Sequence, residues 1–206
     1  MKLYNSLGPN PHVVRMFAAE KGIALPLQSV DVMNAEHRLA PYANLVNSMM
    51  QTPALETDDG AVICEVTAIC EYLEELHPDP PLVGATPAER AETRMWVRRI
   101  DLNILEGRSR AFRATGARAF YKDKIKLLSV PAAEELKSLV EDRILWLDAQ
   151  MSDERYLCGE RYSLADILLY CFMTFGAPAG RNNLPPGADR LQGWYRRVAA
   201  RPAAAA

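Results

Sequence analysis

The residues best suited to chemistry lie in a short loop near the start of the chain, Leu7-Gly8-Pro9-Asn10-Pro11. Proline suits the first turn of a helix, so a helix should begin within this loop. The first backbone N–H groups of a helix and the positive end of its dipole favour the thiolate form of a thiol held beside them. Asn10, Ser6 and Tyr4 add side-chain donors near the same point. The loop therefore predicts a place where a thiol ionises near neutral pH.

The elements that hold this loop are predicted by hydrophobic spacing. Residues 2–5 are strand-like, and apolar residues between 13 and 18 fall on one face of a helix that ends near Gly22. Val30 and Val32 alternate with polar neighbours, which predicts a second strand. A helical crossover between two strands of one sheet makes them parallel. The loop thus lies inside a βαβ unit.

A hairpin and a further helix complete the first part of the chain. Asp58-Asp59-Gly60 is a strong turn signal between residues 53–57 and 61–64. An apolar stripe over residues 66–76 steps at helical spacing and stops before Pro78. Residues 34–47 between the two units are polar and less regular. The predicted order is βαβ, an irregular helix and ββα.

Prolines crowd the interval between His77 and Pro87, where no helix can continue. We expect a first domain over residues 1–78, a linker over 79–87 and an all-helical second domain over 88–206. Four apolar stripes at helical spacing follow: Val97, Ile100 and Ile104; Leu136, Val140, Ile144 and Leu147; Leu164 to Phe175; and Leu191 to Val198. Ser163-Leu164-Ala165-Asp166 is predicted to cap the third of these helices.

Composition narrows the possible functions. With 24 Lys+Arg against 26 Asp+Glu, the 206-residue chain has a formal charge of −2, which disfavours binding to nucleic acid. No segment is long and apolar enough to span a membrane, and the N-terminus lacks the apolar core of a signal peptide, so we expect a cytoplasmic protein without membrane contact. The four cysteines form no CxxC pair and are expected to be buried thiols.

Four segments in order resemble the cytosolic glutathione transferase superfamily, of bacterial type with nu-class-like and theta- or phi-like features. They are GPNPHVVRMFAAEKG, QTPAL, DDGAVICEVTAICEYLEE and YSLADI. The resemblance implies an α/β thioredoxin-like N-terminal domain with a four-stranded mixed sheet, followed by an all-α helical bundle. It also implies glutathione as co-substrate, no metal, a small electrophilic or disulfide substrate, and a homodimer. The thiol at the loop would then be that of glutathione, because the loop has no cysteine.

The residue that donates to the glutathione sulfur has three candidates. Serine-type members carry a serine before the loop proline, where this chain has Gly8. Asn10 is favoured, because Pro9-Asn10 is similar to the proline-asparagine pair of nu-class and yeast prion-related transferases. Ser6, Tyr4 and the backbone N–H groups alone are the alternatives, and Asn10 could instead only shape a turn or cap the helix.

The resemblance also assigns the binding of the glutathione backbone. Thr52 precedes Pro53, which matches the family's cis-proline, and would pair with the cysteinyl unit through its main chain. Glu65 matches the acid that takes the γ-glutamyl ammonium, although the helix dipole alone favours an acid there. The family's serine or threonine after this acid is replaced by Val66, so weaker binding or substitution by Thr67 is expected. His37 would meet the glycyl carboxylate, or be only solvated, and Gln51 matches the residue before the cis-proline segment.

The second substrate is expected between the domains. Its candidate contacts are Trp96, Arg99, Asn103, Phe112 and Arg113, with Phe120 and Tyr121 as further walls. Trp96 and Phe112 could equally be ordinary packing aromatics. Asp101 resembles an acid that reaches the glutathione of the other subunit in dimeric relatives, or is a solvent-facing helical residue.

Two functions follow from these features. The first is a transferase of the detoxification type that activates glutathione for attack on an electrophile, or a related disulfide reductase, β-etherase or peroxidase. The second is a non-catalytic binding or scaffold protein of the same fold. Gly8 and Val66 favour the second function, because each removes a hydroxyl from the expected site.

Overall fold

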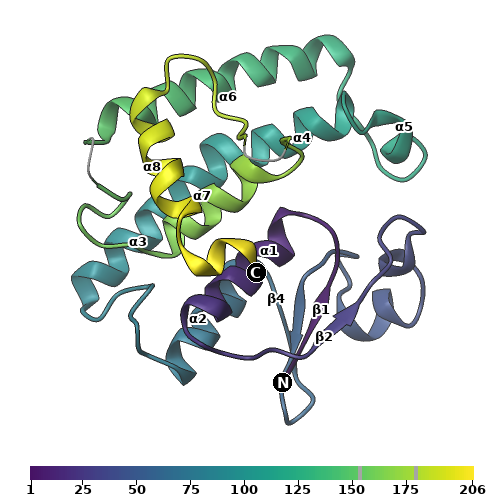
Figure 1. The fold of residues 1–206 in the computed structure, drawn as a ribbon. Helices are drawn as coiled ribbons and strands as arrows, with labels where there is room; N and C mark the ends of the chain where they lie inside the picture. Colours follow the sequence, from purple (N-terminus) through teal and green to yellow (C-terminus); the bar gives the residue numbers. More distant parts are fainter. Residues whose placement is uncertain (153–154, 179–180) are drawn as a thin grey trace.

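A four-stranded mixed sheet forms the centre of the N-terminal half of the computed structural model, which describes residues 1–152, 155–178 and 181–206 (Figure 1). Its strands are β1 (Lys2–Asn5), β2 (Leu27–Ser29), β3 (Ala54–Glu56) and β4 (Val62–Cys64), in the order β2-β1-β3-β4. β1 and β2 are parallel, with Asn5 opposite Ser29, and the other pairs are antiparallel. The predicted mixed sheet and the predicted parallel pair are therefore confirmed.

Successive residues of β1 serve two different cores, as expected for side chains that alternate across a sheet. Leu3 belongs to the main core together with residues of α1 (Pro9–Glu20) and α2 (Val66–Leu76). Tyr4 faces the opposite side and packs with Tyr42 of the π-helical turn η2 (Tyr42–Val46). The short 3-10 helix η1 (Glu36–Arg38) precedes η2. The two faces of the sheet are thus covered by different elements.

The second strand is shifted from its predicted place. β2 ends at Ser29, whereas the alternation of Val30 and Val32 predicted a strand two to three residues later. Val30 is buried and its N–H still donates to the Asn5 carbonyl at 2.7 Å. The chain then turns, because the Val32 N–H donates back to the Val30 carbonyl at 3.0 Å. The apolar pattern marked the buried end of the strand and the turn after it.

A buried ion pair anchors the segment between the two halves of the chain. The Lys21 ammonium lies 2.6 Å from the Glu74 carboxylate, and both side chains are buried. Glu74 also accepts the backbone N–H groups of Leu82 and Val83 at 3.2 and 2.8 Å. Lys21 donates in addition to the Pro80 carbonyl at 2.7 Å. The proline-rich segment is therefore held by specific hydrogen bonds to both helices of the sheet half.

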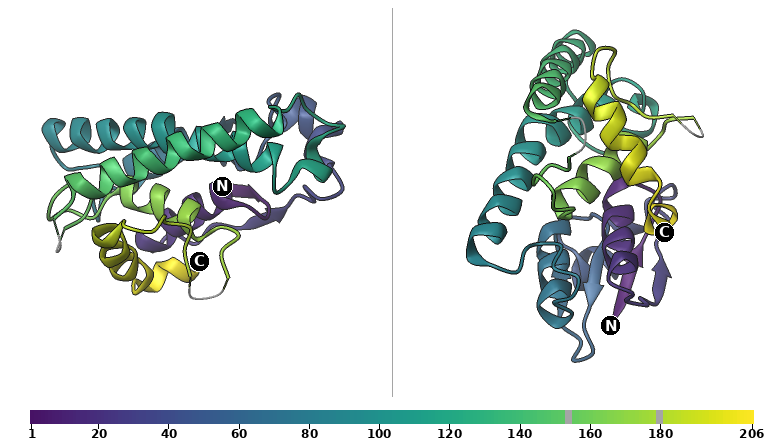
Figure 2. Two further views of the ribbon diagram at one scale, coloured as in Figure 1. Left: turned by 90° about the horizontal axis from the view of Figure 1, so that it is seen from above. Right: turned by 60° about the vertical axis from the view of Figure 1, so that its left-hand side comes forward.

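Helices account for the chain from Pro87 onward in the part that the structure describes (Figure 2). They are α3 (Pro87–Ile100), the π-helical turn η3 (Asp101–Leu105), α4 (Glu106–Ala114), α5 (Arg118–Tyr121), α6 (Val130–Gln150), α7 (Leu164–Thr174), α8 (Asp189–Ala199) and the 3-10 helix η4 (Pro202–Ala205). α7 packs against both α1 and α3, and η4 lies alongside α1. The main core runs through α1 and α7, so it joins the two halves. None of the described helices combines the length and apolar character needed to cross a bilayer.

The predicted cap of α7 is built around one buried carboxylate. Asp166 accepts the backbone N–H groups of Ser163 and Leu157 at 2.9 Å each and the indole N–H of Trp194 at 2.8 Å. The Ser163 hydroxyl donates to the same carboxylate at 3.0 Å. Burial raises the pKa of Asp166 to about 6, although these donors oppose the shift. The capping segment therefore ties α7 to α8 through Asp166.

Candidate active site

A cavity of about 310 Å³ opens between the two halves of the chain. We call it the interdomain cavity. The sheet half contributes Asn10, Asn47, Gln51, Thr52, Pro53, Glu65, Val66 and Thr67, and the helical half contributes Asp101, Leu105, Glu106, Ser109, Arg113, Leu168 and Phe172. Its volume lies at the lower end of the range usual for small-ligand sites. Seven residues that the sequence singles out for thiol activation or glutathione binding therefore lie on one wall.

Asn10 reaches the cavity from the first turn of α1. Gly8 is the N-cap of this helix and provides no side-chain cap. Because Pro9 and Pro11 lack N–H groups, the first turn has fewer free backbone donors than an ordinary helix start. The side-chain amide of Asn10 adds donors where these are missing.

Ser6 lies just outside the interdomain cavity but contacts its wall. The Ser6 and Thr52 hydroxyl oxygens are 2.5 Å apart, and Ser6 is buried. The peptide bond between Thr52 and Pro53 is cis, in agreement with the expectation for QTPAL. Ser6 thus fixes the side chain of a cavity residue, while its own oxygen is already hydrogen-bonded.

Tyr4 is not among the residues that line the cavity, and its hydroxyl is hydrogen-bonded on another face of β1. The hydroxyl donates to Glu56 Oε2 at 2.7 Å, toward the end of β3 that lies far from Thr52. Burial raises the pKa of Tyr4, and the hydrogen bond with Glu56 acts in the same direction. The alternation along β1 turns this side chain to the face that carries Tyr42.

Glu65 enters the cavity from a backbone conformation that few residues adopt. It is the N-cap of α2 and has a φ of 70°, in the left-handed region. Such a conformation costs about 1–3 kcal/mol in a residue other than glycine and concentrates at functional sites. Val66 and Thr67 follow in the first turn of α2, so the wall there offers backbone N–H groups and one hydroxyl.

The opposite wall adds charge from the helical half. Asp101 and Glu106 bring two further carboxylates near Glu65, and Arg113 brings one guanidinium. Burial raises the pKa of Asp101, and the nearby Glu106 carboxylate adds to this shift while Arg98 opposes it. The cavity therefore has an excess of negative charge, which favours an ammonium group on the ligand. Asp101 therefore lines the interdomain cavity of its own chain.

His37 and Gln51 lie at different distances from the cavity. Gln51 lines it, and its carbonyl accepts the Tyr42 hydroxyl at 2.7 Å and the Asn47 amide at 3.0 Å. His37 is buried in η1, does not line the cavity, and its Nδ1 has no hydrogen-bond partner among the described residues. Burial lowers the pKa of His37, and the nearby Arg38 and Lys124 lower it further.

The predicted contacts of the second substrate separate into two groups. Arg113 lines the interdomain cavity, and Phe112 packs edge-on against Phe175 with ring centres 6.3 Å apart. Trp96, Arg99, Asn103 and Phe112 are not among the residues that line this cavity. Trp96 stacks near Trp146 of α6, Arg99 lies over the Trp96 ring, and the Asn103 amide donates to the Arg99 carbonyl. Phe120 and Tyr121 pack against each other in α5.

Leu105 and Ser109 line the cavity without having been predicted from the sequence, and they share a helical spacing with the predicted residues Asp101 and Arg113. Asp101, Leu105, Ser109 and Arg113 recur at every fourth position from η3 through α4, so they fall on one face. This spacing is visible in the sequence, whereas Trp96 and Arg99 lie on another face of the same helical stretch. Asn47, Leu168 and Phe172 belong to the cavity because of tertiary packing, which no local pattern indicates.

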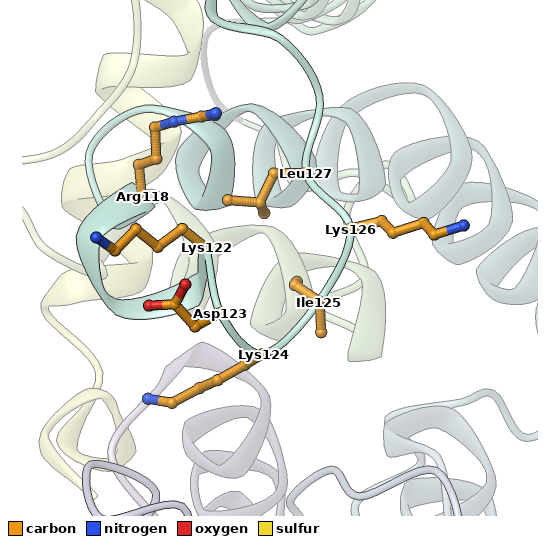
Figure 3. A pocket seen from close by; sticks show the side chains of 7 residues that line it. All are labelled: Arg118, Lys122, Asp123, Lys124, Ile125, Lys126 and Leu127. Atoms are coloured by element: carbon orange, nitrogen blue, oxygen red, sulfur yellow. The ribbon is translucent and has the colours of Figure 1, made fainter.

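A larger but more open hollow of about 640 Å³ lies beyond α5, within residues 118–127 (Figure 3). Lys122, Lys124 and Lys126 extend away from one another, and Lys124 lies over the Phe120 ring. None of its lining residues belongs to the predicted site. Among the described residues, no group of three or more His, Cys, Asp and Glu could hold a metal ion.

A thioredoxin-like sheet half, joined to a helical half across a cavity that begins at the first turn of α1, defines the fold class of the glutathione transferases. The profile of the glutathione S-transferase N-terminal domain matches residues 7–76, and that of the C-terminal domain matches residues 117–202. The chain belongs to the glutathione S-transferase family.

Individual relatives agree over nearly the whole chain. Glutathione S-transferase 2 of Saccharomyces cerevisiae is 30% identical over 95% of this chain and 83% of its own length. The crystal structure of Gtt2 from Saccharomyces cerevisiae has a TM-score of 0.89 at 26% identity and covers 100% of this chain and 99% of its own. A glutathione S-transferase domain-containing protein of Marinobacter aquaeolei has the same TM-score at 31% identity, over 99% and 100% of the two chains.

Two further relatives differ in what their names describe. The beta-etherase LigF of Sphingobium has a TM-score of 0.84 at 27% identity and covers 99% of this chain and 96% of its own. Elongation factor 1-gamma of Prunus avium is 30% identical over 75% of this chain, which spans only 35% of that protein. The chain is therefore similar both to proteins named as enzymes and to a protein named for translation.

Proposed function

We propose that the protein is a glutathione transferase that ionises the glutathione thiol in the interdomain cavity and directs it at a small electrophile. The observation that carries the proposal is the convergence of Asn10, Thr52 and Glu65, which come from three separate segments, on one cavity closed by the helical half. Each of these residues has a chemical role toward a different part of the tripeptide.

The polar groups of the cavity match the ends of glutathione. We assign the main chain of Thr52 to the cysteinyl unit, in the manner of an added antiparallel strand. Glu65 would take the γ-glutamyl ammonium as a charge-assisted hydrogen bond, with Asp101 and Glu106 close by. The N–H groups at the start of α2 would take the γ-glutamyl carboxylate, with Thr67 supplying the hydroxyl that Val66 lacks. His37 stays a candidate for the glycyl carboxylate, reached when the ligand extends toward η1.

The chemical step needs only a lowered thiol pKa. Asn10 would donate its amide N–H to the sulfur and stabilise the thiolate, and the dipole of α1 would act in the same direction. Because the thiolate is the nucleophile, a lower pKa increases the reactive fraction at neutral pH. The sulfur then forms a bond to an electrophilic carbon, and the leaving group departs with the displaced electron pair.

Calorimetric titration of glutathione and glutathione disulfide into the wild type and Asn10→Ala tests this proposal, with thiolate absorbance in the ultraviolet as the pKa readout. Asn103→Ala is a matched control, because its amide donates to the Arg99 carbonyl outside the cavity. We expect the wild type and Asn103→Ala to bind and lower the thiol pKa, and Asn10→Ala to bind without lowering it. A thiol pKa that is equally low in Asn10→Ala would remove Asn10 from the mechanism.

A non-catalytic scaffold is the second candidate function. It is supported by Gly8 and Val66, which leave out two hydroxyls of the usual site, and by the likeness to elongation factor 1-gamma. This candidate predicts no measurable affinity for glutathione. A dissociation constant in the micromolar to millimolar range would exclude it.

The finer assignments are proposals of the same kind. Disulfide reduction is supported by Pro9-Asn10 and β-ether cleavage by the likeness to LigF, and parallel assays on a disulfide and a β-aryl ether would separate them. We also propose a homodimer, as is usual in the family, which light scattering at several concentrations tests. Cytoplasmic location stays a prediction from the sequence.

A further inference from the structure

A second cavity lies on the other side of the loop that carries Asn10. We call it the loop cavity. It has a volume of about 570 Å³ and is lined by residues 5–8, His12, Arg15, Ser29, Val30 and residues 174–176. Gly8 borders the loop cavity and Asn10 borders the interdomain cavity, so only Pro9 separates the two along the chain. The Ser6–Thr52 hydrogen bond joins their walls.

Arg15 is the charged group of this cavity. It lies three residues after His12, so both side chains fall on one face of α1, opposite the buried Val14 and Phe17. Its Nη1 donates to the Asn5 amide oxygen at 2.5 Å, which orients the guanidinium at the carboxyl end of β1. Ser29 ends the parallel strand β2 at the same edge of the sheet.

No carboxylate balances this charge within the part of the chain that the structure describes. Arg15 has no ion pair there, whereas Arg94, Arg161 and Arg201 each have one. Burial lowers the pKa of Arg15, while the nearby Cys171 thiol acts in the opposite direction and no carboxylate of the described residues contributes. A half-buried guanidinium without an anion is an unusual arrangement, since charged groups away from water are normally paired.

His12 does not compete as a second cation. Burial lowers its pKa, and the charge of Arg15 lowers it further, so the imidazole is neutral at pH 7. The remaining lining divides into hydroxyls from Ser6, Ser29 and Thr174 and apolar surface from Leu7, Val30 and Phe175. The cavity therefore combines one cationic end with an aromatic and aliphatic wall.

We propose that the loop cavity binds the electrophilic co-substrate and that Arg15 selects electrophiles in which an anionic group, such as a carboxylate, is attached to an apolar body. This inference rests on the proposed glutathione transferase function, because the thiolate is assumed to lie at Asn10. The electrophile would then approach the sulfur past Gly8, which carries no side chain. A guanidinium is well shaped to hold a carboxylate through two parallel hydrogen bonds.

The first test compares 4-chloro-3-nitrobenzoate with its methyl ester as electrophilic substrates that the enzyme conjugates with glutathione. In both, the sulfur bonds to the ring carbon and chloride leaves, so the two differ in the charge of one substituent. The ester is intrinsically more reactive toward the thiolate. This difference is the same for every variant, so it cancels when the acid-to-ester ratio of kcat/KM in a variant is compared with that of the wild type. We expect Arg15→Gln to lower the ratio of acid to ester at least tenfold, with Arg15→Lys in between, since a charged hydrogen bond contributes about 1.5–3 kcal/mol.

Two additional variants keep the test decisive. Ser29→Glu places a carboxylate in the cavity while leaving Arg15 and its bond to Asn5 in place, and should also lower the ratio. Arg143→Gln removes an exposed charge on α6 and should leave it unchanged. If Arg15→Gln does not fold by circular dichroism, Arg15→Lys and Ser29→Glu carry the test. A ratio within twofold of wild type in every folded variant would overturn the proposal.

The second test omits glutathione and measures binding of 3-nitrobenzoate and methyl 3-nitrobenzoate by calorimetry. Binding of the acid that weakens in the Arg15 variants and in Ser29→Glu supports the loop cavity as an anion site, even if glutathione itself does not bind and the proposed function fails. If the protein binds glutathione but binds the acid and the ester with equal affinity, the proposed function stands and the inference is overturned.

Discussion

The Lys21 ammonium and the Glu74 carboxylate form a buried ion pair that holds the segment joining the two halves. Removing one partner leaves the other charge buried and alone, which typically costs about 3–5 kcal/mol. We therefore expect Lys21→Met and Glu74→Gln each to lower the free energy of unfolding by several kcal/mol. Urea denaturation checks this, and a double variant should lose clearly less than the sum of the two. Additive losses would mean that the two side chains do not act as a pair.

Tyr162, unlike the buried ion pair, has a buried polar group that its described surroundings do not satisfy. Its hydroxyl is buried without a hydrogen-bond partner among the described residues, while Arg201 lies over its ring. Tyr162→Phe removes an unsatisfied polar group, so we expect thermal stability to be unchanged or to rise by about 1 kcal/mol. Tyr195→Phe is the matched control, because that hydroxyl lies 3.1 Å from Thr174 Oγ1. Its removal should lower the free energy of unfolding by about 1 kcal/mol. A destabilised Tyr162→Phe would show that this hydroxyl has a partner.

Asp166 makes the stability of the helical half depend on pH. Its pKa is raised to about 6, above the ordinary value of 3.8, so its stabilising contribution is complete below about pH 4 and is lost as the pH rises through 6. Two pKa units correspond to about 3 kcal/mol. Asp166→Asn should destabilise by about 2–4 kcal/mol, because an amide cannot accept from all four donors.

Unfolding curves of the wild type and Asp166→Asn at pH 4.5 and 7.5 separate these effects. Since the asparagine does not titrate, the gap in unfolding free energy between the two proteins should be larger at pH 4.5. A gap that grows with pH would reverse the sign of the shift.

Gly8 is predicted to resist replacement even by serine. Its φ of 147° disfavours other residues, although an added Cβ would meet only Pro11 Cδ at 3.9 Å. Gly8→Ala and Gly8→Ser should therefore lose a similar amount of stability, about 1–2 kcal/mol. Differential scanning calorimetry checks this. If Gly8→Ser were as stable as wild type while Gly8→Ala was not, the new hydroxyl would have found a hydrogen-bond partner.

The sequence predicted the order of strands and helices along the chain and the helix starts, because their signals are local. The turn at Asp58-Asp59-Gly60 and the apolar stripe of α2 depend only on neighbouring residues, and the structure confirms both. β2 was predicted too late, because Val30 and Val32 report burial and not pairing.

The candidate site was predictable where a motif has a fixed place in the fold. Thr52, Glu65 and Asn10 lie together in the cavity because each ends or begins an element at the same edge of the sheet half. Tyr4 is a candidate because of the family resemblance, and Trp96 and Arg99 because of their residue types. Whether each side chain reaches the cavity depends on which face of β1 or α3 is turned to it. Only tertiary packing decides that orientation.

The core that runs through α1 and α7 has a consequence for how this protein can be divided or recombined. Met16 and Phe17 on α1 share it with Leu169 and Cys171 on α7. Residues 1–78 produced alone would expose this apolar face of α1 to water, and exchanging the helical half with that of a relative would mismatch it. New substrate preferences in this chain should thus be introduced by substitutions around the cavities, because α1 packs against elements of both halves.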